Sequence, residues 1–244
     1  MPVGSWALAS ALLMHAVTPE AATQAPAKVL RAYGPGGIHH VLQECSDLYR
    51  ERAGVSVAVY KASPQELAKR VPEDGDIFYA GAEYMVDDFV RRNPGVLDLG
   101  TMARLHPRRI GVVVRKGNPL DIRGVECLER EEIDLLAVRL EEMGSFLGPR
   151  ETPRGNVRRS VYTGQEGVAA WRTFPELDAW VTYRSWHVEL RHEAEFIEIP
   201  GDQALRYTPV ALTNRTPHRR EAELFIAFLK SPEARRIFVA HGWD

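Results

Sequence analysis

The chain is organised around Tyr33-Gly34-Pro35-Gly36-Gly37. The five residues before it, Lys28-Val29-Leu30-Arg31-Ala32, form a short apolar segment that is typical of a buried strand. After it, apolar residues recur at helical spacing as far as Gly54; they are Ile38, Val41, Leu42, Cys45, Leu48 and Tyr49. The stretch therefore predicts a strand, a glycine-rich turn and an amphipathic helix, in that order.

A turn of this kind favours the binding of an anion. Unpaired backbone N–H groups and the positive end of the helix dipole point at the same place. Glycine lets a ligand approach the backbone closely. We therefore expect Gly36 and Gly37 to donate backbone N–H groups to an anionic ligand. The alternative, that these glycines only allow tight packing of helix on strand, stays open because the motif alone is weak.

Two later segments repeat the strand, turn and helix pattern. Asp76-Ile77-Phe78-Tyr79-Ala80 predicts a strand, and Gly81-Ala82 the turn before a helix that begins at Glu83. The strand 157–162 leads in the same way through Thr163-Gly164 into a helix over 165–173. Glu83 either caps its own helix or faces the ligand. Thr163 either donates its hydroxyl to the ligand or serves only as an N-cap.

A fourth turn follows the strand predicted over 177–183. Tyr183 and Arg184 stand at the end of that strand, and the Arg184 guanidinium offers a charge-assisted fork to an anion. A solvated surface arginine is the alternative for Arg184. Trp186, just beyond, is interpreted as a core residue.

The remaining pattern is a regular alternation of strands and helices. Ser63-Pro64-Gln65-Glu66 combines an N-cap, a proline at the first helical position and a capping-box glutamate. The segment 105–109 is interpreted as a basic connector before an apolar strand over 110–114. For 133–138, strand and helix both remain open because the periodicity fits either.

Composition excludes some partners. The chain has 244 residues, of which 45% are hydrophobic and 26% charged, as is ordinary for a globular protein. A net charge of −2 gives no reason to expect nucleic acid or an anionic membrane surface as a partner. Cys45 and Cys127 have no metal-binding spacing and are interpreted as a buried core residue and a free thiol.

The N-terminal segment resembles a secretory signal peptide. The apolar run Trp6–Val17 is too short to span a bilayer, and alanine-rich residues 21–25 follow it. We expect a signal peptide over residues 1–25, although residues 1–5 lack the usual lysine or arginine. A periplasmic or secreted location follows. No later segment is apolar for long enough to cross a bilayer, so stable membrane insertion is not expected.

Motifs of catalysis are missing from the sequence. It contains no G-x-S-x-G, H-E-x-x-H, Walker A or dinucleotide fingerprint. His39 and His40 are adjacent, so on a helix they point in different directions and are poorly placed to share a metal. We therefore expect no enzyme activity, no cofactor and no metal.

Several of these motifs together resemble one family, accessory colonisation factor C. They are Tyr33-Gly34-Pro35-Gly36-Gly37, the run 76–85, Asp178-Ala179-Trp180, Val210-Ala211-Leu212-Thr213, the run 228–234 and Gly242-Trp243. The family belongs to the type II periplasmic solute-binding proteins, close to the molybdate- and sulfate-binding group. The resemblance covers most of residues 28–244 and is looser in the middle of the chain.

The resemblance implies an α/β, two-lobed, periplasmic-binding-protein-like type II fold with a ligand cleft between the lobes. Residues 26–107 and 208–244 would form lobe one, and residues 108–207 lobe two. The chain would cross between the lobes near 105–110 and return near 199–207. Lobe one would thus be built from both ends of the chain.

The implied function is capture of a small oxyanion or of a phosphorylated or carboxylated organic acid. Its expected partners are the small anionic ligand, an ABC transporter permease for uptake or sensing, and a second copy in a homodimer. The expected ligand-binding residues are Gly36, Gly37, Gly81, Ala82, Glu83, Thr163, Gly164, Tyr183 and Arg184. The sequence departs from the family at 138–145, which carries two acids, and at Ala82, where a serine is common.

Two other functions stay open. A non-transport adhesin or colonisation factor would keep the fold without capturing a solute. An enzyme on a bilobal scaffold is less favoured, but fold does not determine function. A binding assay with small oxyanions separates capture from adhesion, and a turnover assay would be needed to detect an enzyme.

Overall fold

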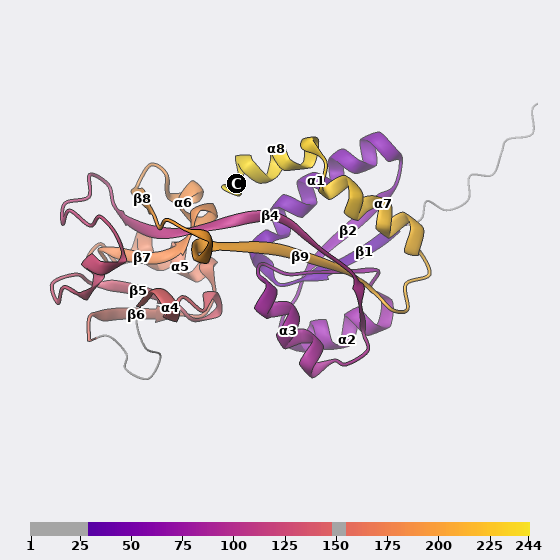
Figure 1. Ribbon diagram of the computed structural model, residues 1–244, viewed down its shortest axis with the longest axis horizontal. Coiled ribbons are helices and arrows are strands. Elements are labelled where there is room, and N and C mark those ends of the chain that lie inside the picture. Colours follow the sequence, from indigo (N-terminus) through magenta and orange to yellow (C-terminus); the bar gives the residue numbers. More distant parts are fainter. Residues whose placement is uncertain (1–28, 148–154) are drawn as a thin grey trace, which may run out of the picture.

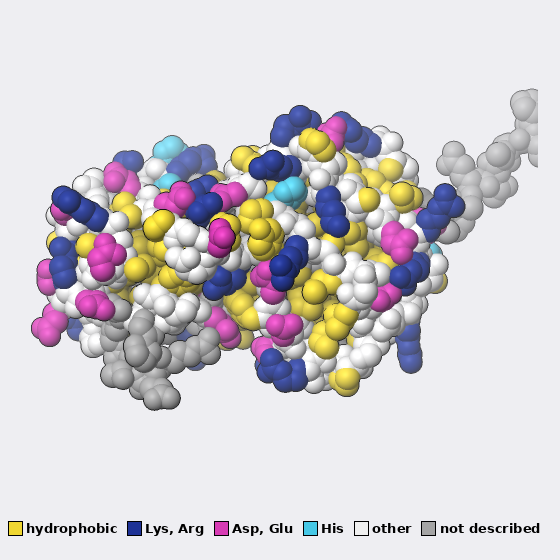
Figure 2. Space-filling model, in the orientation of Figure 1, with side chains coloured by type: hydrophobic (Ala, Val, Ile, Leu, Met, Phe, Trp, Pro, Cys, Tyr) yellow, Lys and Arg dark blue, Asp and Glu magenta, His cyan; other side chains and the backbone are white. Residues whose placement is uncertain are grey.

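The computed structural model describes residues 29–147 and 155–244, so the expected signal peptide lies outside the described residues. The expected α/β class is confirmed, and the elements gather into two lobes (Figure 1). None of the described helices is long and apolar enough to cross a bilayer. On the face drawn in Figure 2, basic and acidic side chains are interspersed over both lobes.

Lobe one contains the sheet order β2-β1-β3-β9-β4. β1 (Val29–Gly34) pairs in parallel with β2 (Ser56–Lys61) and β3 (Ile77–Tyr79), and β3 pairs antiparallel with β9 (Leu205–Thr213). Its helices are α1 (His39–Ala53), α2 (Pro64–Asp74), α3 (Glu83–Arg92), α7 (Arg219–Leu229) and α8 (Pro232–Ala240), and a 3-10 turn, η1 (Gly36–Ile38), precedes α1.

Lobe two is built on the second half of β4 (Leu97–Arg115), which pairs antiparallel with β7 (Ala179–Tyr183) and β8 (Ala194–Glu198). β5 (Leu135–Val138) lies between β7 and β6 (Val157–Val161), parallel to both. The helices are α4 (Gly144–Leu147), α5 (Gly164–Thr173) and α6 (Arg184–Leu190), with 3-10 turns η2 (Val125–Glu129), η3 (Arg139–Glu141) and η4 (Asp202–Ala204). Segment 133–138, left open by its periodicity, is thus largely a strand.

The two lobes are joined by β4 and β9, which run side by side from one lobe to the other (Figure 1). Their antiparallel register shifts twice, between Asp98 and Ala103 and between Arg104 and Pro107. The interpretation of 105–109 as a connector that precedes a strand is therefore corrected, although the segment does lie where the chain passes between the lobes. Its backbone is part of β4, because Pro107 and Arg108 pair with Tyr207 and Arg206 of β9.

Local sequence explains where the helices of lobe one begin and end. The expected capping box of α2 is confirmed: the Ser63 hydroxyl accepts from the Glu66 N–H, and the Glu66 carboxylate accepts from the Ser63 N–H. Helix α1 ends at Gly54, whose φ of 67° is the left-handed conformation that glycine adopts without strain. Gly34 is also required, because a Cβ there would overlap the Tyr79 carbonyl and ring.

Each lobe has its own core. That of lobe two surrounds the fully buried indoles of Trp171 and Trp180. That of lobe one packs α1, α7 and α8 on the sheet, with Phe225, Phe238 and Trp243 among its buried side chains. Both cysteines are free, and Cys45 is buried, as expected.

Candidate ligand site between the lobes

Three strand-to-helix junctions that carry glycines converge on one cavity between the lobes, with a volume of about 300 Å³. Arg108 reaches it from the crossing strand β4. The other lining residues of lobe one are Pro35, Gly36, Gly37, Lys61, Gly81 and Met85, and those of lobe two are Leu140, Glu141, Thr163, Gly164, Gln165, Tyr183 and Trp186. Both lobes therefore contribute to the walls.

The glycines at the start of α1 leave room beside the backbone. A Cβ at Gly36 would meet only the Lys61 side chain, at 3.6 Å, and a Cβ at Gly37 would meet only Trp186, at 3.8 Å. Neither glycine is therefore demanded by packing against its neighbours. Their lack of side chains instead keeps the backbone at this corner of the cavity open to a ligand.

At the junction before α5, the glycine (Gly164) is required by packing. Thr163 caps α5, since its hydroxyl accepts from the Glu166 N–H at 3.2 Å and the Glu166 carboxylate accepts in return from the Thr163 N–H. A Cβ at Gly164 would overlap the Trp186 indole, so this glycine allows the indole to lie against the start of the helix. Capping and packing thus fix the position of this wall.

Arg108 is the buried cation of the site. Its side chain is only 3% exposed, and its guanidinium donates to the Gly81 carbonyl at 3.3 Å and to the Ser185 hydroxyl at 2.8 Å. It also stacks on the Tyr183 ring, 3.8 Å from the ring centroid, and lies 4.8 Å from that of Trp243. Hence the guanidinium is held in place by both lobes.

Two donors at the site have no hydrogen-bond partner in the part of the chain that the structure describes. They are Nε of Arg108 and the hydroxyl of Tyr183, and both atoms are buried. Burial raises the pKa of Tyr183 to about 12, so its hydroxyl keeps its proton at neutral pH. Burial also lowers the pKa of Arg108, although a guanidinium stays charged in proteins. Unpaired buried donors are costly unless a ligand satisfies them.

Glu141 is the buried acid of the site. Its carboxylate accepts from the Thr182 hydroxyl at 2.7 Å and from the Trp186 indole N–H at 2.5 Å. Burial raises the pKa of Glu141 to about 7, against the lowering effect of the Thr182 bond and of the Arg108 charge. Near neutral pH the cavity therefore combines the buried positive charge of Arg108 with one buried acid that is close to half ionised; the exposed Lys61 also lines it.

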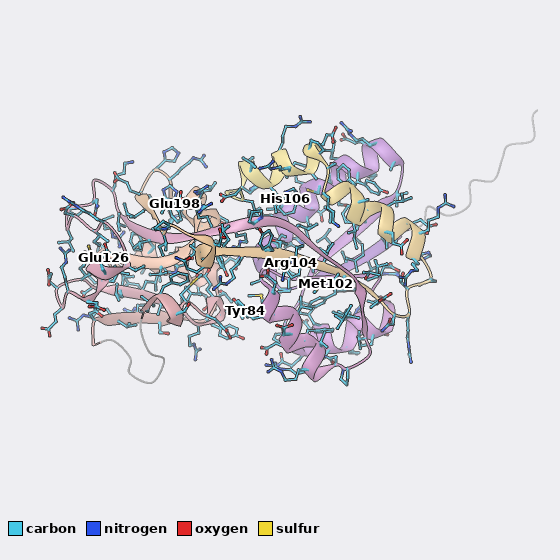
Figure 3. The ribbon with its side chains drawn as sticks, in the orientation of Figure 1. Tyr84, Met102, Arg104, His106, Glu126 and Glu198 are labelled. Carbon is cyan, nitrogen blue, oxygen red and sulfur yellow. The ribbon has the colours of Figure 1, made fainter. Side chains whose placement is uncertain are left out.

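Tyr84 lies beside the site at the boundary between the lobes, where it is labelled in Figure 3. It belongs to α3 of lobe one, and its hydroxyl donates to the Leu140 carbonyl of lobe two at 2.7 Å. Burial raises the pKa of Tyr84 well above its ordinary value, so this donor is permanent. The bond links lobe one to Leu140, a residue of lobe two that lines the cavity.

A family model agrees with this architecture over most of the chain. The model for bacterial extracellular solute-binding proteins matches residues 30–144 and 151–244. The chain belongs to this family. Among curated proteins, none is significantly similar to this solute-binding protein in sequence.

Solved structures of the same fold include binders of small anions. L-phospholactate-bound PEB3 has a TM-score of 0.71 at 22% identity, over 88% of this chain and 98% of that one; PEB3 comes from Campylobacter jejuni. The periplasmic molybdate-binding protein of Azotobacter vinelandii has 0.66 at 13% identity, over 88% and 98%. The sulfate-binding protein SubI of Mycobacterium tuberculosis has 0.66 at 15% identity, over 88% and 86%. The two-lobed type II periplasmic-binding-protein fold is therefore shown.

The structure brings six of the nine residues expected at the ligand together in the cavity wall of this solute-binding protein: Gly36, Gly37, Gly81, Thr163, Gly164 and Tyr183. Ala82, Glu83 and Arg184 do not line this cavity. Ala82 is the buried N-cap of α3. Glu83 accepts from the Tyr207 N–H at 3.3 Å and faces Arg104 at 3.8 Å. Arg184 pairs with Asp244 at 2.6 Å and Glu198 at 2.8 Å.

Sequence reasoning missed three functional candidates. Arg108 was overlooked because it lies in the segment interpreted as a connector. If the strand is extended by two residues before Ile110, Arg108 lies on the same face of the strand as Ile110. Glu141 was noticed only as one of two acids. Trp186, interpreted as core, is buried but also lines the cavity. Its indole N–H donates to Glu141, a contact for which the sequence contains no signal.

We expect Gly36→Val to weaken binding of an anion by roughly 10- to 100-fold, the value of one lost charge-assisted hydrogen bond. The added side chain would occupy the open space beside the backbone and keep the ligand away from it. Isothermal titration with 3-phosphoglycerate measures the effect, with circular dichroism as a check on folding. Gly155→Val is the matched control, since a Cβ there meets no heavy atom within 4 Å. An unchanged affinity in folded Gly36→Val would place the ligand elsewhere.

Proposed function

We propose that this protein captures a small oxyanion or a phosphorylated or carboxylated organic acid in the cavity between its lobes. The observation that carries the proposal is Arg108, a buried cation that lines the cavity and whose Nε lacks a partner among the described residues. An anion that accepts from this nitrogen would satisfy it. A charged acceptor makes such bonds stronger than neutral ones.

Backbone donors supply the rest of the binding energy in this proposal. Gly36, Gly37 and Gly164 lie where a strand leads into a helix, so their N–H groups belong to the unpaired first turn. Thr163 and Tyr183 add hydroxyl donors. Each hydrogen bond to a charged ligand contributes on the order of 1.5–3 kcal/mol, so a few of them suffice for micromolar affinity after the costs of association.

The biological setting is also part of the proposal. Membership in the extracellular solute-binding family and likeness to periplasmic proteins support a place outside the cytoplasm. They support delivery to an ABC-type transporter or a sensor as the role, and they favour binding over catalysis. We further propose that the chain belongs to the accessory colonisation factor C family, that its lobes divide at 107/108 and 207/208, and that it forms a homodimer. An adhesin on the same fold is the second candidate.

The test is a titration that follows Trp186. Its indole lines the cavity and donates to Glu141, whereas Trp171, Trp180 and Trp243 are fully buried and do not line the cavity. Closure of the lobes on a ligand would expel water near this indole and change its emission. We expect sulfate, molybdate, 3-phosphoglycerate or citrate to produce that change in the wild type and a much smaller one in Trp186→Phe.

The same titration separates the two candidates. An adhesin without a ligand would show no change in emission and no rise in melting temperature with any of the four compounds at millimolar concentration. That outcome would overturn solute capture. A change of equal size in Trp186→Phe would mean that the emission reports some other tryptophan, and the cavity would then have to be tested by substitution alone.

A further inference from the structure

A second cavity of about 270 Å³ lies beside the first. Pro35, Met85 and Leu140 line both cavities, so the two are neighbours. We call the second cavity the apolar annex; its other lining residues are Pro64, Leu67, Ala68, Phe78, Tyr84, Asp88, Phe89, Arg92, Asn93, Arg139, Glu142 and Tyr162. None of the motifs found in the sequence pointed to it.

The floor of the annex is hydrophobic. Phe78 and Phe89 stack with their ring centroids 4.4 Å apart, and Leu67 beside them is 5% exposed. Charged groups stand at the edge, where Arg92 pairs with Asp88 at 3.5 Å and Arg139 lies over the Tyr162 ring at 5.5 Å. An apolar floor with a polar edge is the usual form of a site for an organic ligand.

Both lobes contribute to the annex. Its residues from Pro64 to Asn93 belong to lobe one, whereas Arg139, Leu140, Glu142 and Tyr162 belong to lobe two. The Tyr84 hydroxyl donates across the boundary to the Leu140 carbonyl, at the place where the annex meets the first cavity. A molecule that fills the annex would therefore contact both lobes, as a molecule in the first cavity does.

We propose that the ligand is an organic acid whose anionic group lies beside Arg108 and whose hydrophobic tail lies in the apolar annex. This rests on the proposed capture of an anion in the first cavity. A tetrahedral inorganic oxyanion has no apolar part and would leave the annex to water. Each cavity has nearly the volume of a small ligand site, roughly 300 Å³, so one extended molecule fits the pair.

The size of the annex and the chemistry of its lining indicate which kind of tail it can hold. Its floor has rings and aliphatic groups, so transfer of methylene groups from water is favourable there. At its edge, Asp88 and Arg92 pair with each other and Arg139 lies over Tyr162, so these three residues do not require a charge on the tail. The tail is therefore an alkyl or aryl group of a few carbons, attached to a phosphate, phosphonate or carboxylate.

Titration with methyl-, butyl- and hexylphosphonate tests this proposal, because the three share one anionic group. We expect the affinity to increase roughly three- to fourfold with each added methylene until the annex is full. Hexanol, which lacks the anion, is expected not to bind at the same concentrations. Calorimetry at a single pH keeps the charge of the three headgroups comparable.

Substitution of Ala68 localises the tail. Ala68 is an exposed residue of α2 that lines the annex and not the first cavity. We expect Ala68→Glu to abolish the gain from chain length without changing the affinity for methylphosphonate, and Ala68→Gln to retain most of the gain. Gln65→Glu adds the same charge to α2 outside the annex and is expected to behave as the wild type.

Failure of this inference differs from failure of the proposed function. If the three phosphonates bind equally, or if Ala68→Glu keeps the full gain, the annex does not hold the tail, while capture of an anion stands. Binding of hexanol as tightly as hexylphosphonate would also overturn the link between headgroup and tail. If neither methylphosphonate nor any small oxyanion binds, the proposed capture of anions fails as well.

Discussion

Replacing Arg108 with glutamine is expected to weaken the binding of an anionic ligand about 100-fold, near the upper value of one lost charge-assisted hydrogen bond. The guanidinium is the buried cation of the cavity, with bonds to Gly81 and Ser185 and an Nε that has no partner within residues 29–147 and 155–244. Glutamine can replace one of its neutral contacts but not its charge. Isothermal titration with sulfate and with 3-phosphoglycerate measures the loss.

Two further variants make the Arg108 experiment decisive. Arg108→Lys keeps the charge but loses the planar fork, so we expect an intermediate loss of affinity. Arg184→Gln removes an arginine that is engaged with Asp244 and Glu198, and we expect its affinity to stay within about twofold of the wild type because surface ion pairs contribute little. Wild-type affinity in folded Arg108→Gln, or a larger loss in Arg184→Gln, would contradict the assignment of the binding arginine.

The binding of sulfate is expected to weaken about tenfold or more between pH 6 and pH 8.5, because Glu141 ionises in this interval. Burial raises the pKa of this carboxyl to about 7, so it is mostly neutral at pH 6 and mostly charged at pH 8.5. The new negative charge stands in the wall of an anion site. Sulfate is the suitable probe because its own charge is constant over this range.

Glu141→Gln is the matched variant for the pH experiment. The amide oxygen can still accept from Trp186, and the side chain stays neutral at every pH. We expect the variant to bind sulfate at pH 8.5 about as well as the wild type does at pH 6, with no dependence on pH between them. A slope that persists in Glu141→Gln would assign the titration to another group. Arg108, Tyr84 and Tyr183, which face Glu141, keep their protons throughout this range.

The free energy of unfolding of the ligand-free protein is expected to fall with increasing pH, as the affinity for sulfate does. The pKa of Glu141 is higher in the folded protein, about 7, than its ordinary value of 4.5. The folded state therefore holds more protons than the unfolded state between these two values. The stabilisation from this group is complete below about pH 4.5 and is lost as the pH increases to about 7.

The sequence predicted the features of the fold that depend on neighbouring residues. The capping box of Ser63 and Glu66 can be recognised within four residues, and the structure confirms it. The glycine turns after β1 and β3 were found in the same way, because a strand, a glycine and an amphipathic helix follow one another directly. Such patterns report local geometry, so they also identified six of the fourteen residues that line the cavity.

The charged residues of the site could not be predicted in this way, because their burial depends on distant parts of the chain. Arg108 is enclosed by Tyr183 and Trp243, which come from β7 and from the segment after α8. Of the adjacent acids, Glu141 is buried while Glu142 is exposed with a φ of 51°, and nothing in their order distinguishes them. Arg184 pairs with Asp244, which is 60 residues away in the sequence. The sequence gives no sign of this pair, so Arg184 was expected at the ligand.

Because β4 and β9 pass between the lobes, the sheet of lobe one cannot finish folding before lobe two has been synthesised. β3 needs β9 as its second neighbour, yet the whole of lobe two is encoded between them. Strands β5, β6 and β7, in contrast, pair with partners from their own part of the chain. Loop closure over a long segment costs entropy and slows folding. During synthesis, one edge of β3 therefore stays unpaired until all of lobe two and then β9 have been made.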